Sequence, residues 1–479
     1  MAQGRYPGVD RPWYKSWPAG VPRSLGPPRT TLVRMVEEYA RTRGGRTAVN
    51  FYGAVLDYGR LDELAVRLAL ALIRRGLSRG DRICLFMENC PQFIIACLAA
   101  WKAGAVAVPA NPMLKEEELS HLLRHSACQT IILRDALYPV FHGAREGNGP
   151  QNVIVTRFSD FLPEAAELPL HPSLSAPLCY FPDACEFLSL LAEEGGGPLE
   201  PGDLPDPALI LYTAGATGTP KGAVITHANL TANVRCASVW YGGMSGAHLA
   251  VLPLCHATGL VGSLGVALFQ GDPVILLARY DTETVLCAVE KYRCTNWVSV
   301  PTMNVAVVNY PGVEKRNLSS LRVCTCGAAP VPVEVFERFR AVTGVPLVEG
   351  YGLSETTSQV TINPFDRPRP GSVGIPVMDT DVRLVDPDDP EKEMGPGQTG
   401  ELLVGVRRLP PPTGTTLWKT AVPSPAAGSP RETWRAWTPT ATSTWPGEKR
   451  RLSRPPATAS FRPRWRRCSP ATRPWRRWR

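Results

Sequence analysis

Blocks of apolar and polar residues alternate along the chain, and their lengths and periods separate helices from strands. Residues 61–76 carry apolar side chains at helical spacing, whereas 82–87 is a short apolar run of the length of a buried strand. The next block, 91–104, is opened by a proline and closed by a glycine, as helices often are. After a loop-rich region between about 140 and 205, the same alternation resumes. This pattern predicts an α/β fold in which parallel sheets carry helices on both faces.

Changes of pattern divide the chain into three parts. Residues 1–30 are rich in proline and irregular, which predicts an arm that lies on the body of the protein. From about Gly371 short strands and turns replace the alternation, which predicts a small β-rich subdomain beside two α/β sheet subdomains. Neither period continues beyond 405. We therefore expect an N-terminal arm (1–30), a body (31–405) and a tail without fixed structure (406–479).

The net charge of +9 comes from the tail and not from the body. Residues 406–479 contain 17 Lys and Arg but only two Asp and Glu, which leaves 35 basic and 41 acidic residues for 1–405. A mildly acidic body gives no electrostatic support for nucleic-acid binding, so we expect no nucleic-acid partner.

Hydropathy and cysteine spacing bear on the location of the protein and on the redox state of its cysteines. There is no run of about 18 apolar residues, and the N-terminus lacks the apolar segment of a signal peptide. We expect a cytoplasmic protein that associates with membranes at most peripherally, and a homodimer is compatible with the sequence. The thirteen cysteines are scattered without zinc-site spacing, which predicts reduced, structural thiols.

The stretch LYTAGATGTPKG, residues 211–222, combines flexible and anion-binding residues between a strand-like and a helix-like segment. Its glycines let the backbone turn several N–H groups toward one point, and its threonines and Lys221 add further donors. It is not a Walker loop, because Pro220 stands where that pattern needs glycine and Gly222 where it needs Ser or Thr. Spacing alone leaves two interpretations open, a phosphate cradle and a flexible surface loop.

The same stretch resembles the phosphate loop of AMP-forming acyl-CoA synthetases, the adenylate-forming ligases. Four further stretches resemble motifs of this family and occur in the family's order: VLPLCHATGL (251–260), CTCGAAPVP (324–332), VEGYGLSET (348–356) and GPGQTGELLV (395–404). Residues 11–25 are similar to the start of bacterial long-chain fatty acid–CoA ligases. The resemblance covers about residues 10–405.

This resemblance implies a two-step reaction with ATP, Mg²⁺ and coenzyme A. ATP and a carboxylate form an acyl-adenylate and pyrophosphate, and CoA then displaces AMP. Because the first step brings anions together, it needs a metal ion and cationic donors. A fatty acid is the expected substrate. The alternatives are an aryl- or amino-acid-activating ligase of the same family, a non-catalytic binder of nucleotide or acyl groups, and a basic-tailed nucleic-acid binder.

The resemblance also assigns roles by position. The β- and γ-phosphates are expected to be held by residues of the first motif: Thr213, Gly215, Thr217, Gly218 and Lys221. The adenine is expected to contact residues of the two later glycine-containing motifs: Gly327, Ala328, Ala329, Gly350, Tyr351 and Gly352. Three residues are expected to act in catalysis: Lys221, His256 and Glu355. Glu355 and Thr217 are expected to bind Mg²⁺, Ser354 and Thr356 to lie near the α-phosphate, and His256 to lie beside the carboxylate and the acyl pocket.

Each assignment has a structural alternative. Taken alone, His256 fits a core histidine, Glu355 fits an acid at a helix N-terminus, and Tyr351 fits a core aromatic residue. Ala214 and Ala216 depart from the family, in which hydroxyl residues are common there, and each departure removes a contact of about 1 kcal/mol. The apolar segment after His256 contains small residues that either leave room for an acyl chain or allow close helix packing.

The tail departs from the family pattern. The family continues with an aspartate hinge and a C-terminal domain whose lysine is essential for adenylation, whereas residues 406–479 contain 13 Pro and 7 Trp. An Arg/Trp-rich binding segment and a disordered tail are two interpretations. The third is translation out of frame, and the resemblance then implies weak ATP and acyl binding with greatly reduced adenylation.

We predict that a net single-base insertion or deletion lies near codons 405–417. Read one base earlier, residues 431–433 can encode T-G-D, the family's ribose-binding motif, and 447–454 can encode G-R-K-K-E-T-I-K. Residues 460–467 can then encode V-F-P-A-E-V-E-E in register. Sequencing the DNA across this region tests the prediction, and a confirmed template whose alternative frame lacks T-G-D contradicts it.

Overall fold

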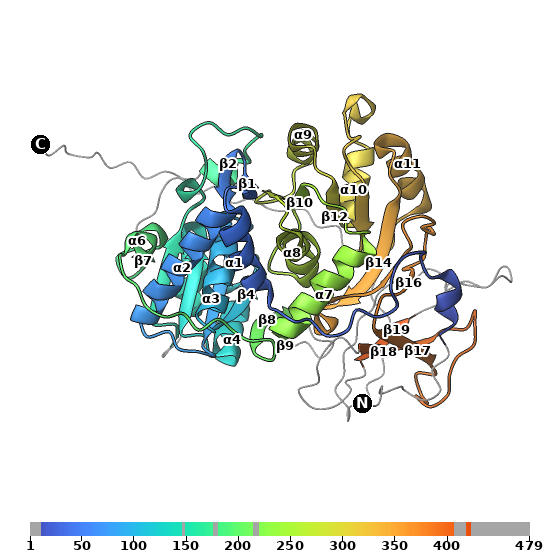
Figure 1. Ribbon diagram of the computed structural model, residues 1–479, viewed down its shortest axis with the longest axis horizontal. Helices are drawn as coiled ribbons and strands as arrows, with labels where there is room; N and C mark the ends of the chain where they lie inside the picture. Colours follow the sequence, from blue (N-terminus) through green and yellow to red (C-terminus); the bar gives the residue numbers. More distant parts are fainter. Residues whose placement is uncertain (1–10, 146–148, 176–180, 214–219, 407–417, 423–479) are drawn as a thin grey trace, which may run out of the picture. The chain divides into compact units, whose positions relative to one another are not determined.

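The computed structural model describes residues 11–145, 149–175, 181–213, 220–406 and 418–422. The chain divides into two units, Met1–Ser443 and Thr444–Arg479, and all described residues belong to the first. Within it the strands form three sheets (Figure 1). The predicted fold class, two α/β sheet subdomains with a small β-rich one, is confirmed.

The first sheet has the strand order β7–β6–β5–β3–β4–β8–β9 and is parallel except for β9. Its strands are β3 (Arg82–Phe86), β4 (Val106–Ala110), β5 (Thr130–Arg134), β6 (Asn152–Thr156), β7 (Cys185–Glu186), β8 (Pro207–Thr213) and β9 (Lys221–Thr226). Its helices are α2 (Tyr58–Arg74), α3 (Pro91–Lys102), α4 (Glu116–Ser126), α5 (Tyr138–Ala144) and α6 (Phe187–Ala192). Ile83 and Leu85 pack in the core with α2 and α3, whereas Cys84 and Phe86 pack with α4 and α5. Both faces are therefore covered by helices, as alternation along a strand requires.

The second sheet has nine strands in the order β16–β15–β14–β13–β12–β10–β11–β1–β2, and its central neighbours, from β14 to β1, are parallel. Its strands are β1 (Thr47–Phe51), β2 (Ala54–Asp57), β10 (His248–Ala250), β11 (Val274–Leu276), β12 (Asn296–Ser299), β13 (Val323–Cys326), β14 (Leu347–Leu353), β15 (Ser358–Ile362) and β16 (Ile375–Pro376). Helix α1 (Leu32–Arg43) packs against α2 of the first subdomain (Figure 1). The helices that follow the first sheet in the chain are α7 (His227–Trp240), α8 (Val266–Gln270), α9 (Thr282–Tyr292), α10 (Pro301–Val308) and α11 (Val333–Thr343). Because β1 and β2 precede the first sheet in the chain, the two subdomains are interleaved in sequence.

The β-rich subdomain is an antiparallel sheet of β17 (Thr380–Val385), β18 (Gly400–Val406) and β19 (Trp418–Val422). β19 lies within the segment for which we expected no fixed structure. Its backbone pairs with the free edge of β18, a long-range effect that local composition does not reveal. The remaining residues of that segment, beyond 406, lie outside the described part of the chain.

Short helical turns complete the described elements. A π-helical segment, η5 (Thr258–Gly265), leads directly into α8. The 3₁₀ turns are η1 (Pro12–Ser16), η2 (Asp135–Leu137), η3 (Phe158–Asp160), η4 (Pro172–Ser175), η6 (Val313–Lys315) and η7 (Ser354–Thr356). None of the helices in the described ranges is long and apolar enough to cross a membrane.

The described part of the N-terminal segment crosses from the β-rich subdomain to the second sheet subdomain (Figure 1, dark blue). The Arg11 guanidinium forms two contacts with the Asp381 carboxylate of β17, at 2.6 and 3.0 Å. Trp13 is buried, and Trp17 packs edge-on against Trp240 of α7 with ring centroids 5.2 Å apart. Paired charge and aromatic burial thus hold this segment on the body.

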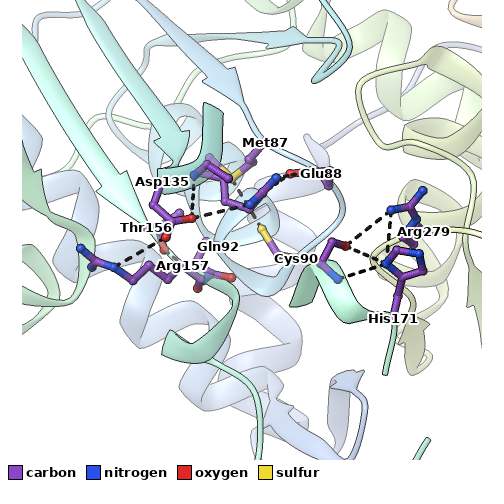
Figure 2. Close-up of polar contacts among 12 residues, drawn as sticks. Met87, Glu88, Cys90, Gln92, Asp135, Thr156, Arg157, His171 and Arg279 are labelled. Atoms are coloured by element: carbon purple, nitrogen blue, oxygen red, sulfur yellow. Dashed lines mark hydrogen bonds and ion pairs between the residues drawn. The ribbon is translucent and has the colours of Figure 1, made fainter. Parts of the chain in front are cut away.

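The carboxyl edge of the first sheet is occupied by side chains that bind one another (Figure 2). Arg134, at the end of β5, forms a bidentate ion pair with Glu88 after β3. The buried Gln92 amide donates to Thr156 Oγ1 at 3.0 Å and to the Arg157 carbonyl at 2.6 Å. Open α/β sheets often bind ligands at this edge, but here these polar groups form hydrogen bonds and ion pairs with one another.

The buried imidazole of His227 makes stability depend on pH. His227 is fully buried at the start of α7, and neither ring nitrogen has a hydrogen-bond partner among the described residues. Its ring packs edge-on against Trp101, and a Cβ on Gly202 would lie 2.4 Å from its Nε2. This burial lowers the pKa of His227 to about 4.

We predict that His227 destabilises the fold below neutral pH. Because its folded pKa lies below the value of about 6.5 for an exposed histidine, its full contribution is present above pH 6.5 and is lost as the pH falls toward 4. His227→Leu should remove about 2 kcal/mol of the loss in unfolding free energy between pH 7.5 and 4.5. Urea denaturation at both pH values measures it, with the exposed His142→Leu as control. Equal pH dependence of wild type and His227→Leu would contradict the prediction.

Candidate functional site

The hairpin of β8 and β9 carries both ends of the predicted phosphate loop. Thr213 and Lys221 lie opposite each other in the antiparallel register. Directly paired residues project to the same face of a sheet, so Thr213 and Lys221 share one face, and Lys221 is exposed. Three predicted loop residues lie outside the described residues: Gly215, Thr217 and Gly218.

The turn η7 places Glu355 beside this hairpin. The Thr213 hydroxyl donates to Glu355 Oε1 at 3.4 Å, although the two residues are 142 positions apart. η7 also lies against β9, the strand that begins with Lys221. The structure therefore brings Thr213, Lys221 and Glu355 to one side of the hairpin.

The other two residues of the turn differ in their surroundings. Thr356 is fully buried, and its hydroxyl donates to the Leu353 carbonyl at 3.0 Å and accepts the Leu353 N–H at 3.2 Å. This side chain thus closes its own turn, and Asn233 holds the Thr356 carbonyl from α7. Ser354 is partly exposed at the start of the turn.

A cavity of about 110 Å³ joins the two motifs expected to contact adenine. Its lining comes from the loop after β13, from β14 and from a third loop: Ala328, Ala329, Pro330, Glu349, Gly350, Tyr351, Gly352, Leu353, Gly371, Ser372 and Val373. Gly327 lies next to this lining, because a Cβ there would be 3.3 Å from the Gly350 carbonyl oxygen. Five of the six residues expected at the adenine therefore line one cavity.

Sequence reasoning missed Glu349, which organises this cavity. Its carboxylate accepts the Val331 N–H at 3.1 Å and the Gly371 N–H at 3.0 Å. These N–H groups belong to the two loops that flank β14. Burial raises the pKa of the Glu349 carboxyl. The feature of the sequence that could have indicated this role is an acidic residue directly after the apolar residues that begin β14.

His256 belongs neither to the β8–β9 hairpin and η7 nor to the lining of the cavity. It is exposed on a turn after β10, and its Nε2 lies 3.5 Å from the Asn111 amide of the first subdomain. Desolvation by the surrounding protein nevertheless lowers the pKa of its imidazole. Buried Asn89 fixes the turn by binding the Leu252 carbonyl at 3.0 Å and the Leu254 N–H at 2.8 Å. Among the described residues, no hydrogen bond or ion pair joins His256 to Glu355 or Lys221.

The small residues after His256 serve packing in part. A Cβ on Gly265 would lie 2.6 Å from Val234, so this glycine lets η5 pack closely against α7. A Cβ on Gly262 would meet only Val298, at 3.6 Å. Close helix packing therefore accounts for Gly265 and leaves Gly262 open to another role.

Comparison with known proteins defines the class of this protein. The AMP-binding enzyme family matches residues 36–408, and the chain belongs to this family. It is 31% identical to a long-chain-fatty-acid–CoA ligase of Bacillus subtilis over 405 residues, which are 82% of this chain and 72% of that protein. It is 34% identical to a feruloyl-CoA synthase of Amycolatopsis over 377 residues, covering 76% and 68% of the two chains. The crystal structure of a benzoate CoA ligase from Burkholderia xenovorans aligns with a TM-score of 0.67 at 26% identity, covering 79% of this chain and 72% of that one.

We predict that Glu349→Ala destabilises the fold by about 2 kcal/mol, because two enclosed backbone N–H groups lose their acceptor. Glu349→Gln should cost less, since its remaining oxygen still accepts one of them. Urea denaturation of both variants tests this, with Glu337→Ala on the exposed side of α11 as the matched control. An unfolding free energy of Glu349→Ala equal to that of the control would refute the assignment.

Proposed function

We propose that this protein activates a fatty acid with ATP to an acyl-adenylate and transfers the acyl group to coenzyme A, releasing AMP and pyrophosphate. The observation that carries the proposal is the meeting of Thr213, Lys221 and Glu355 on one side of the β8–β9 hairpin. An ammonium and a carboxylate on one exposed face suit a triphosphate bound with a divalent cation. Family membership supports the same reaction class.

The described residues fit Mg²⁺. Mg²⁺ prefers oxygen ligands and is often held by one or two carboxylates together with substrate phosphates. Glu355 supplies one carboxylate, with the Thr213 hydroxyl beside it. No cluster of three metal-binding side chains is found in the described ranges. In this proposal Glu355 and Thr217 hold Mg²⁺, which neutralises charge on the phosphates.

The remaining roles are assigned by position. The Lys221 ammonium binds the β- and γ-phosphates together with Thr213, Gly215, Thr217 and Gly218. The cavity bounded by Ala328, Ala329 and Tyr351 binds the adenine, with Gly350 and Gly352 in its wall and Gly327 next to it. Ser354 and Thr356 position the backbone near the α-phosphate, and His256 lies at the entrance used by the carboxylate. The cytoplasmic location, the homodimer and the division into arm, body and tail stay predictions.

An aryl acid is the second candidate substrate. The 34% identity to a feruloyl-CoA synthase and the similarity to a benzoate CoA ligase favour it. Pyrophosphate–ATP exchange with octanoate, palmitate, benzoate, ferulate and phenylalanine separates the candidates. Exchange stimulated most by palmitate or octanoate supports the first, and exchange stimulated most by ferulate or benzoate supports the second. Absence of MgATP binding in calorimetry would overturn both.

We predict that Lys221→Ala and Glu355→Gln each lower the acid-dependent exchange rate by about a hundredfold, because each removes a charge at the phosphates. Both variants should also weaken MgATP binding. The exposed Lys315→Ala removes one positive charge elsewhere and should leave both quantities at the wild-type level. Wild-type rates and affinities in either site variant would contradict the assignment of that residue.

A further inference from the structure

The two faces of the β8–β9 hairpin meet different parts of the protein. Thr213 points to the face where Glu355 lies. Its neighbour Tyr212 points to the opposite face, because successive residues of a strand alternate. The proposed site therefore uses one face of this hairpin, and the other face is turned toward α4.

The Tyr212 ring lies close against the paired strand. Tyr212 is opposite Gly222, and a Cβ on Gly222 would lie 3.4 Å from two ring atoms of Tyr212. It would also lie 2.6 Å from the Ile210 side chain. The glycine thus leaves the space that the Ile210 side chain occupies, and the Tyr212 ring lies within ordinary contact distance of the paired strand.

Two histidines of α4 contact the end of β8 and the residue before β9 from this face. His125 Nδ1 lies 2.7 Å from the Tyr212 hydroxyl, and His121 Nε2 lies 3.2 Å from the Pro220 carbonyl oxygen. A carbonyl can only accept, so His121 donates an Nε2–H to Pro220. The histidines are four residues apart, and their rings stack with centroids 5.6 Å apart and planes inclined by 22°. One strand end is therefore held through Tyr212 and the other through Pro220, directly before Lys221.

α4 is a firm support for these contacts. Its opposite side buries Leu119, Leu122 and Leu123 in the same core as Cys84 and Phe86 of β3. At its start the Glu118 carboxylate accepts the Lys115 N–H at 2.9 Å. Both histidines are thus fixed relative to the centre of the first sheet.

We propose that His121 and His125 are positioning residues that hold the β8–β9 hairpin so that Lys221 and Thr213 are presented to the phosphates of a nucleotide. The inference rests on the proposed function for its consequence, since Lys221 is the group being positioned. Ordering both strand ends before binding removes freedom that the nucleotide would otherwise have to restrict. We call these two contacts, His121 with Pro220 and His125 with Tyr212, the brace. The brace therefore changes the affinity for ligands that reach the hairpin and does not change the affinity for ligands that bind only in the adenine cavity.

Hydrogen–deuterium exchange of the full chain tests the brace without any nucleotide. In His121→Ala the backbone amides of residues 209–213 and 221–224 should exchange about threefold faster or more, while those of α3 stay as in wild type. His121→Gln keeps a donor for the Pro220 carbonyl and should restore most of the protection. The exposed His142→Ala on α5 is the matched control. Unchanged exchange of the hairpin in His121→Ala would overturn the proposal.

Calorimetry with MgATP and with AMP tests the consequence. His121→Ala should weaken MgATP binding about three- to tenfold and leave AMP binding within about twofold, because one hydrogen bond is lost at the hairpin and none among the residues that line the adenine cavity. Tyr212→Phe, which removes the hydroxyl that contacts His125, should act in the same direction. Equal weakening of both ligands, or none, would refute a positioning role. A wild-type chain that binds neither ligand would reject the proposed function, and the exchange experiment would still decide the brace.

Discussion

Antiparallel pairing of Thr213 with Lys221, on the face of the hairpin where Glu355 lies, is the contact on which the whole site depends. The register fixes which side chains share that face, and a slip of one residue would turn Lys221 away from Glu355. The hairpin is also the only antiparallel pair among the described strands of the first sheet. Its second strand, β9, lies against the turn η7, which follows β14 of the second sheet.

The second sheet contributes to the site through the strand β14 and the turn η7 at its end. One residue of this strand, Glu349, holds the loops on both sides of the cavity, and η7 presents Glu355 to the hairpin. A single strand thus relates the proposed adenine cavity to the proposed phosphate-binding face. This arrangement connects the two proposed binding regions although they are built from separate loops.

Much of this organisation could be predicted from the sequence, because it is encoded locally. The apolar runs and their periods indicated the strands and helices of both sheets, and the ordered motifs indicated the residues of the cavity. Interleaving of β1 and β2 with the second sheet could not be predicted, since strand order depends on pairing between distant segments. Glu349 was missed because its partners are backbone N–H groups of two loops that carry no sequence signal. The histidines of α4 were missed for the same reason, since one of them binds a carbonyl. The pairing of β19 with β18 could likewise not be predicted from the amino-acid composition of that segment.

Two glycines of the motifs have a different role from the one that spacing suggests. A Cβ on Gly352 would lie 1.5 Å from the Ser358 carbonyl oxygen, so this position requires glycine for β14 and β15 to pair around their bulge. A Cβ on Gly222 would similarly lie 2.6 Å from the Ile210 side chain. Both glycines are explained by contacts within the protein before any ligand is considered. Flexibility is therefore not their contribution. They allow the close packing that fixes the strands carrying Lys221 and the turn carrying Glu355, the two residues of the proposed phosphate site.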